Sequence, residues 1–162
     1  MAATLSVWEF DTSTGADEAH VKVDRLHAEE VFTVSDGAIV SWEPGTRKPR
    51  TAPFPSADPE GALGGLFWGF LFGVMFFVPL IGMTLGAATG IIAGALTDVG
   101  IDDNFIRRIR RDLRPGTSAL FVLTSSTEVD RLTEAFRGAN ARLLQANLSD
   151  KQEAAIRTAF AD

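Results

Sequence analysis

The chain has 162 residues with no Cys, two His, 15 Lys plus Arg and 21 Asp plus Glu, which gives a formal net charge of −6 and a pI near 4.9. This size fits one domain, and the absence of Cys excludes disulfide scaffolds, thiolate metal sites and cysteine nucleophiles. The acidic balance argues against nucleic acid as the main partner.

The first 60 residues carry strand and helix signals in alternation. Alternating apolar residues predict a strand over 4–11, and a helix follows from about residue 13 to about residue 30. The Asp36-Gly37 pair predicts a turn before a second strand over 38–42. Prolines mark the next stretch as an extended linker or edge strand, and they are Pro44, Pro49, Pro53, Pro55 and Pro59.

Residues 61–97 contain no charged side chain, whereas every Asp, Glu, Lys and Arg lies outside them. A run of 37 such residues is typical of a membrane-embedded segment rather than of a core helix. Its position, sixty residues into the chain and without a preceding basic region, excludes a signal peptide. Pro79 splits the run into two helices over about 62–77 and 80–97, so the pattern predicts a helical hairpin with its turn at Pro79.

Glycines recur at every fourth residue on both sides of this proline. Each glycine costs about 1 kcal/mol in a helix exposed to water, so the spacing favours close packing of helices in a bilayer. The alternative is a glycine-rich hairpin buried in a soluble protein, but a domain of this size has little protein with which to bury it. The predicted packing residues of this glycine zipper are Gly61, Gly65, Gly69, Gly73, Gly82, Gly86, Gly90 and Gly94.

The predicted helix over about 62–77 would be roughly 24 Å long, which is shorter than a hydrocarbon core of roughly 30 Å. The tip of the hairpin has no polar side chain, so its backbone groups need burial in protein. The tips either meet one another in an oligomer or cross a thin membrane. We therefore expect a homo-oligomer.

Basic residues flank the apolar run on both sides. A second helix over about 102–113 is amphipathic, with apolar residues on one face and arginines on the other. The arginines form either a collar that contacts lipid headgroups or a solvated basic face paired with acids. The collar residues are Arg107, Arg108, Arg110 and Arg111. The positive-inside rule places both flanks in the cytoplasm.

The remaining elements follow in a regular order. Pro115-Gly116 ends the amphipathic helix, and an apolar strand is predicted over 118–124. Ser125 and Glu128 form a capping box for a helix that Gly138 ends. A strand over 142–148 and a C-terminal helix capped by Ser149 and Gln152 complete the chain.

These elements predict an α+β fold, a ferredoxin-like split βαβ sandwich with the long apolar glycine-zipper hairpin inserted between its second and third strands. Residues 1–60 form the first half of the sandwich with a Pro-rich linker, and residues 61–97 form the hairpin. Residues 98–162 form the basic helix, the second half and the C-terminal helix.

The strings ALGGLFWGFLFGVMFFVPLIG, GAATGIIAGALTDVGIDDNFI and LRPGTSALFVL carry a resemblance to a known family. The chain resembles the bacterial "predicted membrane protein" family known as domain of unknown function 1269. The resemblance implies a bacterial, membrane-linked protein with a glycine-zipper hairpin, and it implies no catalytic residues.

The sequence predicts no catalytic, cofactor-binding or metal-binding residues. No phosphate-binding or dinucleotide-binding glycine motif is present. His20 and His27 share a helix face without a third ligand, so surface or packed histidines are favoured over a metal site. Asp98, Asp102 and Asp103 at the hairpin mouth are explained by helix capping rather than by a cation.

We expect a non-enzymatic, self-assembling, membrane-associated structural protein whose hairpin embeds in lipid or in the core of an oligomer. The alternatives are a pore lined by the hairpins and a regulatory module that binds a small molecule. The expected partners are the chain itself and membrane lipid, without nucleic acid or a cofactor. The expected location is the bacterial inner membrane or a lipid-containing assembly, with the charged domain in the cytoplasm.

Overall fold

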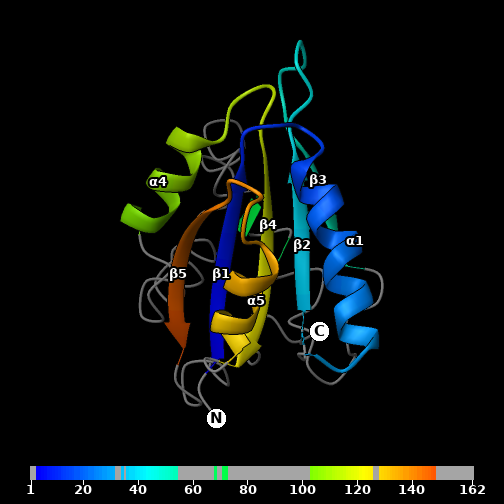
Figure 1. The fold of residues 1–162 in the computed structure, drawn as a ribbon. Coiled ribbons are helices and arrows are strands. Elements are labelled where there is room, and N and C mark those ends of the chain that lie inside the picture. The colour runs from blue at the N-terminus through cyan, green and yellow to red at the C-terminus, as the bar shows by residue number, and fades with distance from the viewer. Residues whose placement is uncertain are drawn as a thin grey trace.

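The computed structural model describes residues 3–31, 34, 36–54, 68, 71, 72, 103–125 and 128–148. The elements along these residues (Figure 1) are β1 (Ala3–Phe10), α1 (Gly15–Ala28), β2 (Asp36–Ser41), β3 (Arg50–Pro53), α4 (Asp103–Asp112), β4 (Ser118–Ser125), α5 (Val129–Ala135) and β5 (Arg142–Leu148). Trp68, Leu71 and Phe72 are also helical.

The five strands form one sheet in the order β3-β2-β4-β1-β5, and all neighbouring strands are antiparallel. The interior strand β1 pairs with two strands from the far end of the chain, so that Val7 lies opposite Phe121 in β4 and opposite Leu144 in β5. The Ser6 hydroxyl adds a hydrogen bond to the Val122 carbonyl oxygen at 3.3 Å. The sheet therefore joins both ends of the described chain.

One face of the sheet is covered by α1 and α5, which lie over the same side in Figure 1. Successive residues of a strand point to opposite faces, so every second residue of β1 and β4 faces these helices. The apolar cluster on this side contains Trp8, Phe10, Ala16, Ala19, Val23, Val34, Ile39, Phe54, Leu120, Val122, Leu132 and Phe136.

The opposite face is covered by α4 and by the helical residues Trp68, Leu71 and Phe72. Its cluster combines strand residues with the apolar side of α4, and Ile109 is fully buried there. The members are Leu5, Val7, Ala38, Val40, Trp68, Leu71, Phe72, Phe105, Ile106, Ile109, Leu113, Ala119, Phe121, Leu123 and Leu144. The sheet is therefore the middle layer of three.

Trp68 is 1% exposed and is fixed by polar and aromatic contacts at once. Its indole Nε1 donates a hydrogen bond of 2.9 Å to Oδ2 of the buried Asp36. Its ring stacks on Phe72 with 5.8 Å between centroids and meets the edge of Phe121 at 6.3 Å. A buried indole N–H requires such an acceptor, so Asp36 fixes where Trp68 packs on the sheet.

The predicted fold is wrong in its central feature. The expected ferredoxin-like split βαβ sandwich carried a hairpin between its second and third strands, whereas the chain after β2 turns through 42–49 and pairs back as β3. The prolines allow this because Pro53 lies in an edge strand, where one N–H fewer is tolerated. The structure is a five-stranded antiparallel sheet with helices on both faces.

The predicted membrane protein with a glycine-zipper hairpin is also contradicted. The described residues of the apolar run, Trp68, Leu71 and Phe72, are buried against the sheet at 1%, 0% and 3% exposure. Within the described ranges, the longest helix is α1 with 14 residues, and no helix is both long and apolar enough to span a bilayer. The physical reason is that the second face of the sheet needs an apolar cover, and these residues supply part of it.

One predicted helix cap is wrong, and α1 is capped by a residue from a distant strand. No side chain of the local sequence caps α1 at Thr14; the Ser118 hydroxyl of β4 instead accepts a bond of 2.9 Å from the Ala16 N–H. The predicted capping box is absent, because Ser125 belongs to β4 and Glu128 makes no capping hydrogen bond. Gly138 has φ +86, as a residue after a helix end requires. The predicted C-terminal helix lies outside the described residues.

The Asp36-Gly37 pair lies in strand β2 rather than in a turn. A Cβ atom at Gly37 would overlap the Phe54 ring and would lie 2.7 Å from the Phe121 carbonyl oxygen. Glycine is therefore needed for close approach of β2 to β4 and to the Phe54 ring, not for a bend.

Candidate functional site

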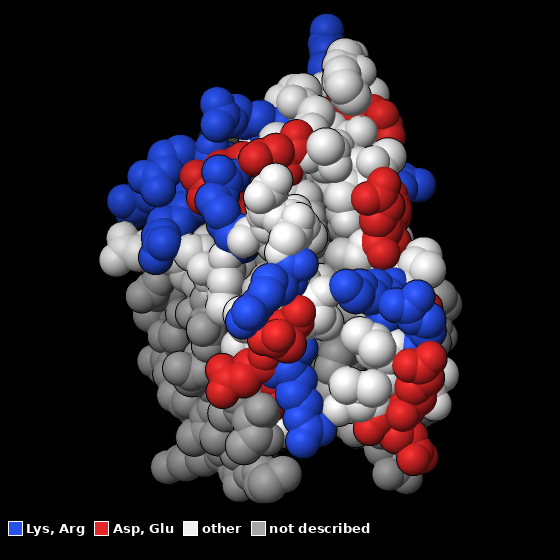
Figure 2. Space-filling model, in the orientation of Figure 1, with Lys and Arg blue, Asp and Glu red and all other residues white. Residues whose placement is uncertain are grey.

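Helix α4 presents an arginine surface, which we define as Arg107, Arg108, Arg110 and Arg111. The apolar residues Phe105, Ile106 and Ile109 alternate with them at helical spacing and are 8%, 7% and 0% exposed. Burial of this apolar stripe against the sheet directs the arginines to solvent, where all of them are exposed. Figure 2 shows the resulting concentration of basic side chains over α4.

The arginines of this surface have few partners within the described residues. Arg111 Nε lies 3.7 Å from Asp112 Oδ1, whereas Arg107, Arg108 and Arg110 form no ion pair there. Arg110 and Arg111 lie in the last turn of α4, where a positive charge complements the helix dipole. That effect does not account for Arg107 and Arg108 in the middle of the helix.

A shallow hollow of about 420 Å³ lies on this surface, lined by Asn104, Arg107, Arg108 and Arg111. Guanidinium groups present several N–H donors in a planar fork and match the oxygens of phosphate or carboxylate groups. The hollow therefore has the donors and the positive charge to receive an anion.

A buried carboxyl group lies beneath the arginine surface. Glu9 of β1 is 3% exposed, and its Oε2 has no hydrogen-bond partner in the described part of the chain. Burial raises the pKa of Glu9 from its ordinary 4.5 to about 7, and repulsion and hydrogen bonding from the Asp112 side chain act in the same direction. Arg142 and Arg108 lower this pKa in part.

Glu9 and Asp112 therefore form a carboxyl pair between the sheet and the end of α4. Two neighbouring carboxyl groups are stable together when one of them holds a proton. Such a pair resembles the acid and base pairs of enzymes, but Glu9 is 3% exposed, so a substrate reaches it only if α4 moves. The arrangement links the protonation of Glu9 to the position of α4.

The histidines have structural contacts. His20 stacks on Phe54 with 4.3 Å between ring centroids, and its Nε2 lies 3.4 Å from Asp24 Oδ2. His27 Nδ1 accepts a hydrogen bond of 3.2 Å from the Val34 N–H. Within the residues that are described, no three His, Cys, Asp or Glu residues gather as metal ligands.

The structure describes only part of the predicted site. Arg107, Arg108, Arg110 and Arg111 all lie exposed on α4, and their predicted role as a collar that contacts lipid headgroups stays a prediction. The eight glycines of the predicted zipper and Pro79 lie outside the described residues, as do Asp98 and Asp102. No helix of the described chain is long and apolar enough to cross a membrane.

The burial of Glu9 was not predicted, because a single acid in a short strand resembles a solvent-exposed position, and Asp36 was predicted in a turn rather than at the start of β2. A signal for Glu9 was available: it continues the spacing of Leu5 and Val7, which face the core. For Asp36 the signal was indirect, since Trp68 in an apolar run needs a hydrogen-bond acceptor from elsewhere.

The chain matches a protein-family model. The family described as "Protein of unknown function (DUF1269)" matches residues 62–161, which is more than half of the chain. No curated protein and no solved structure matches the chain.

Proposed function

The chain belongs to the family of unknown function that matches residues 62–161, and we propose that it is a non-enzymatic binding module whose α4 arginine surface holds phosphate groups. The observation that carries the proposal is that Arg107, Arg108 and Arg110 lie together without an ion-pair partner among the described residues, in a chain with net charge −6. Among the described residues, Asp112 forms an ion pair with Arg111 alone, so the other three arginines keep positive charge that a bound anion can neutralise.

The rigid support of α4 favours binding. Ile109 is fully buried and Phe105 and Ile106 nearly so, which fixes the backbone from which the arginines project. Like charges held close together repel one another in the free protein, and a bound anion relieves this repulsion. Each guanidinium can then form charge-assisted hydrogen bonds to phosphate oxygens, worth about 1.5–3 kcal/mol each.

The charge of the whole chain favours a compact anion over a long one. A polyanion such as nucleic acid would extend beyond α4 over a protein with net charge −6 and would be repelled there. A lipid headgroup and a free phosphate ester share the chemistry that this surface recognises, and they differ in whether a bilayer is needed.

The experiment compares both sources on the full chain. Binding is measured by calorimetry with inorganic pyrophosphate, and by sedimentation with vesicles of phosphatidylcholine alone or mixed with phosphatidylglycerol. The variant R107Q/R108Q/R111Q removes three charges from the hollow. The control R25Q/R131Q/R137Q removes three exposed arginines located elsewhere.

We expect the α4 variant to bind at least about tenfold more weakly and the control to bind within about twofold of the parent. Binding of pyrophosphate without vesicles indicates a free phosphate ligand, and binding only to anionic vesicles indicates a headgroup. Equal losses in the two variants would mean that net charge alone attracts anions. Absence of binding in both arms would also refute the proposal.

Self-assembly and a pore remain predictions from the apolar sequence at 61–97. Light scattering coupled to size-exclusion chromatography measures the number of subunits directly. A monomer at all concentrations would contradict the predicted homo-oligomer, and it would leave the α4 proposal unaffected because that surface belongs to a single chain.

A further inference from the structure

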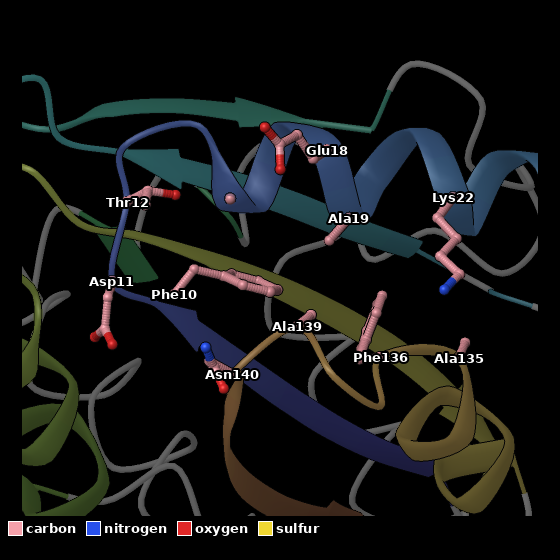
Figure 3. Close-up of a pocket in the computed structure, with 11 residues that line it drawn as sticks. Phe10, Asp11, Thr12, Glu18, Ala19, Lys22, Ala135, Phe136, Ala139 and Asn140 are labelled. Atoms are coloured by element: carbon pink, nitrogen blue, oxygen red, sulfur yellow. The ribbon is translucent and has the colours of Figure 1, made fainter.

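A hollow of about 330 Å³ opens between α1 and α5, on the face of the sheet opposite α4 (Figure 3). Its floor is aromatic: Phe10 and Phe136 are 4% and 5% exposed, with ring centroids 6.2 Å apart and nearly perpendicular. The buried Trp8 ring packs edge-to-face against the Phe136 ring, with 4.9 Å between the two ring centroids. The floor is therefore fixed before any ligand arrives.

Small residues keep the hollow open. Gly15 and Ala19 line its α1 side, and Ala135 and Ala139 line its α5 side. None of these has a side chain long enough to reach across, so the two helices leave a gap that larger residues would fill. The volume lies at the lower end of the range for small-molecule sites and suits a ligand with one ring or one branched chain.

Two opposite charges lie at the rim without forming a pair. Glu18 and Lys22 are four residues apart on α1, a spacing that ordinarily supports an ion pair, with backbones about 6 Å apart along the helix. No hydrogen bond or ion pair joins either side chain to a described residue, whereas the nearby Asp11 lies 3.7 Å from Arg142. Figure 3 shows Lys22 extending from α1 toward Phe136.

We propose that this hollow binds a small zwitterion with an apolar side group, the chemistry of a free α-amino acid such as leucine or phenylalanine. The ligand's carboxylate pairs with the Lys22 ammonium and its ammonium pairs with the Glu18 carboxylate. The apolar group lies on Phe10 and Phe136. A zwitterion satisfies both rim charges, whereas a ligand with a single charge leaves one of them without a partner.

The first test varies the ligand. Calorimetry and amide chemical shifts are recorded with leucine, with 3-methylbutylamine, which lacks the carboxylate, and with 4-methylpentanoate, which lacks the ammonium. We expect leucine to bind at least about tenfold more tightly than either analogue, as the loss of one charge-assisted hydrogen bond implies. Equal affinity for all three, or no binding of leucine up to its solubility limit, would overturn the proposal.

The second test varies the protein. Lys22→Met and Glu18→Gln each remove one rim charge, and Arg25→Gln and Glu29→Gln are matched controls because both residues are exposed near the other end of α1. We expect about a tenfold loss of leucine affinity in the first two and less than twofold in the controls. Equal effects in rim and control variants would overturn the assignment.

A third variant fills the hollow. Ala139→Leu is made at an exposed loop position, so the fold does not depend on it, and Ala19→Leu fills the α1 side. We expect both to abolish leucine binding while the circular dichroism spectrum is unchanged. If Ala19→Leu fails to fold, Ala139→Leu alone decides, and unaltered binding in it would contradict the location of the site.

Discussion

The two faces of the sheet are covered in different ways. On the α1 and α5 face, the helices stand apart and leave a hollow above Phe10 and Phe136, and the polar anchor is the neutral Ser118 hydroxyl, which accepts from Ala16 and donates to the Thr12 carbonyl at 2.7 Å. On the α4 face, the cover is continuous with the core, and its polar anchors are the carboxyl groups of Asp36 and Glu9.

This difference shows how charge can specify position within an apolar layer. Hydrophobic contacts are not directional, so an apolar cover could pack on the sheet in several ways. A buried carboxyl group that must find a donor or keep a proton selects one of them. The α4 face therefore has a defined arrangement, and the opposite face has space for a ligand.

The largest expected effect is on the free energy of unfolding, and the two variants that produce it should differ in anion binding. Ile109→Ala on α4 and Leu132→Ala on α5 each remove a fully buried side chain and should each lower the free energy of unfolding by about 3–4 kcal/mol in urea titrations. Only Ile109→Ala should also weaken pyrophosphate binding, because only α4 supports the arginine surface. An equal loss of binding in Leu132→Ala, measured where both variants are folded, would contradict this distinction.

A smaller effect is expected from the two buried indoles. Trp68→Phe removes a donor from the Asp36 carboxylate and should lower the free energy of unfolding by about 2–3 kcal/mol. Trp8→Phe removes a hydrogen bond of 3.1 Å to the Ser6 hydroxyl, which still donates to the Val122 carbonyl oxygen. The loss in free energy of unfolding should therefore be about 1 kcal/mol smaller than for Trp68→Phe. Urea unfolding of both variants measures the difference, and equal costs would show that the charge of Asp36 has no special role.

The third effect depends on pH. Between pH 4.5 and 7 the folded chain holds a proton on Glu9 that the unfolded chain releases, so this group lowers stability as the pH rises through that window. Glu9→Gln removes the cost and should stabilise the fold by about 3 kcal/mol at pH 8 but not at pH 4.

The control for this pH dependence is Glu134→Gln, an exposed position in an ion pair of 2.8 Å with Arg137. Its effect on the free energy of unfolding should stay within about 0.5 kcal/mol at either pH. A stabilisation by Glu9→Gln that is the same at pH 4 and pH 8 would mean that the proton on Glu9 is not involved.

The strands were the most predictable part of the fold. The alternation in residues 4–11 and the apolar run at 118–124 each lie within one residue of β1 and β4, and 142–148 coincides with β5. The amphipathic helix was equally clear, because Phe105, Ile106 and Ile109 recur at helical spacing between arginines. These signals are local, so a single sequence contains them.

The errors concern contacts between distant residues. The buried position of Trp68 depends on its hydrogen bond to Asp36. The cap of α1 at Ala16 comes from Ser118, which is 102 residues away in the sequence. Neither partner is marked by local sequence. A long uncharged run satisfies the criteria for a membrane segment, and it also satisfies those for the cover of a sheet face, so composition alone could not distinguish the two.

The position of β1 inside the sheet, between β4 and β5, has a consequence for folding during synthesis. This strand is translated well before both of its neighbours, β4 and β5, which come from residues 118–148. Contacts across so many residues form slowly, because a long loop must close before they can stabilise the fold. During translation, β1 therefore stays without its partner strands until most of the chain has been synthesised, and its alternating apolar residues stay exposed. We expect a chaperone to act on this segment.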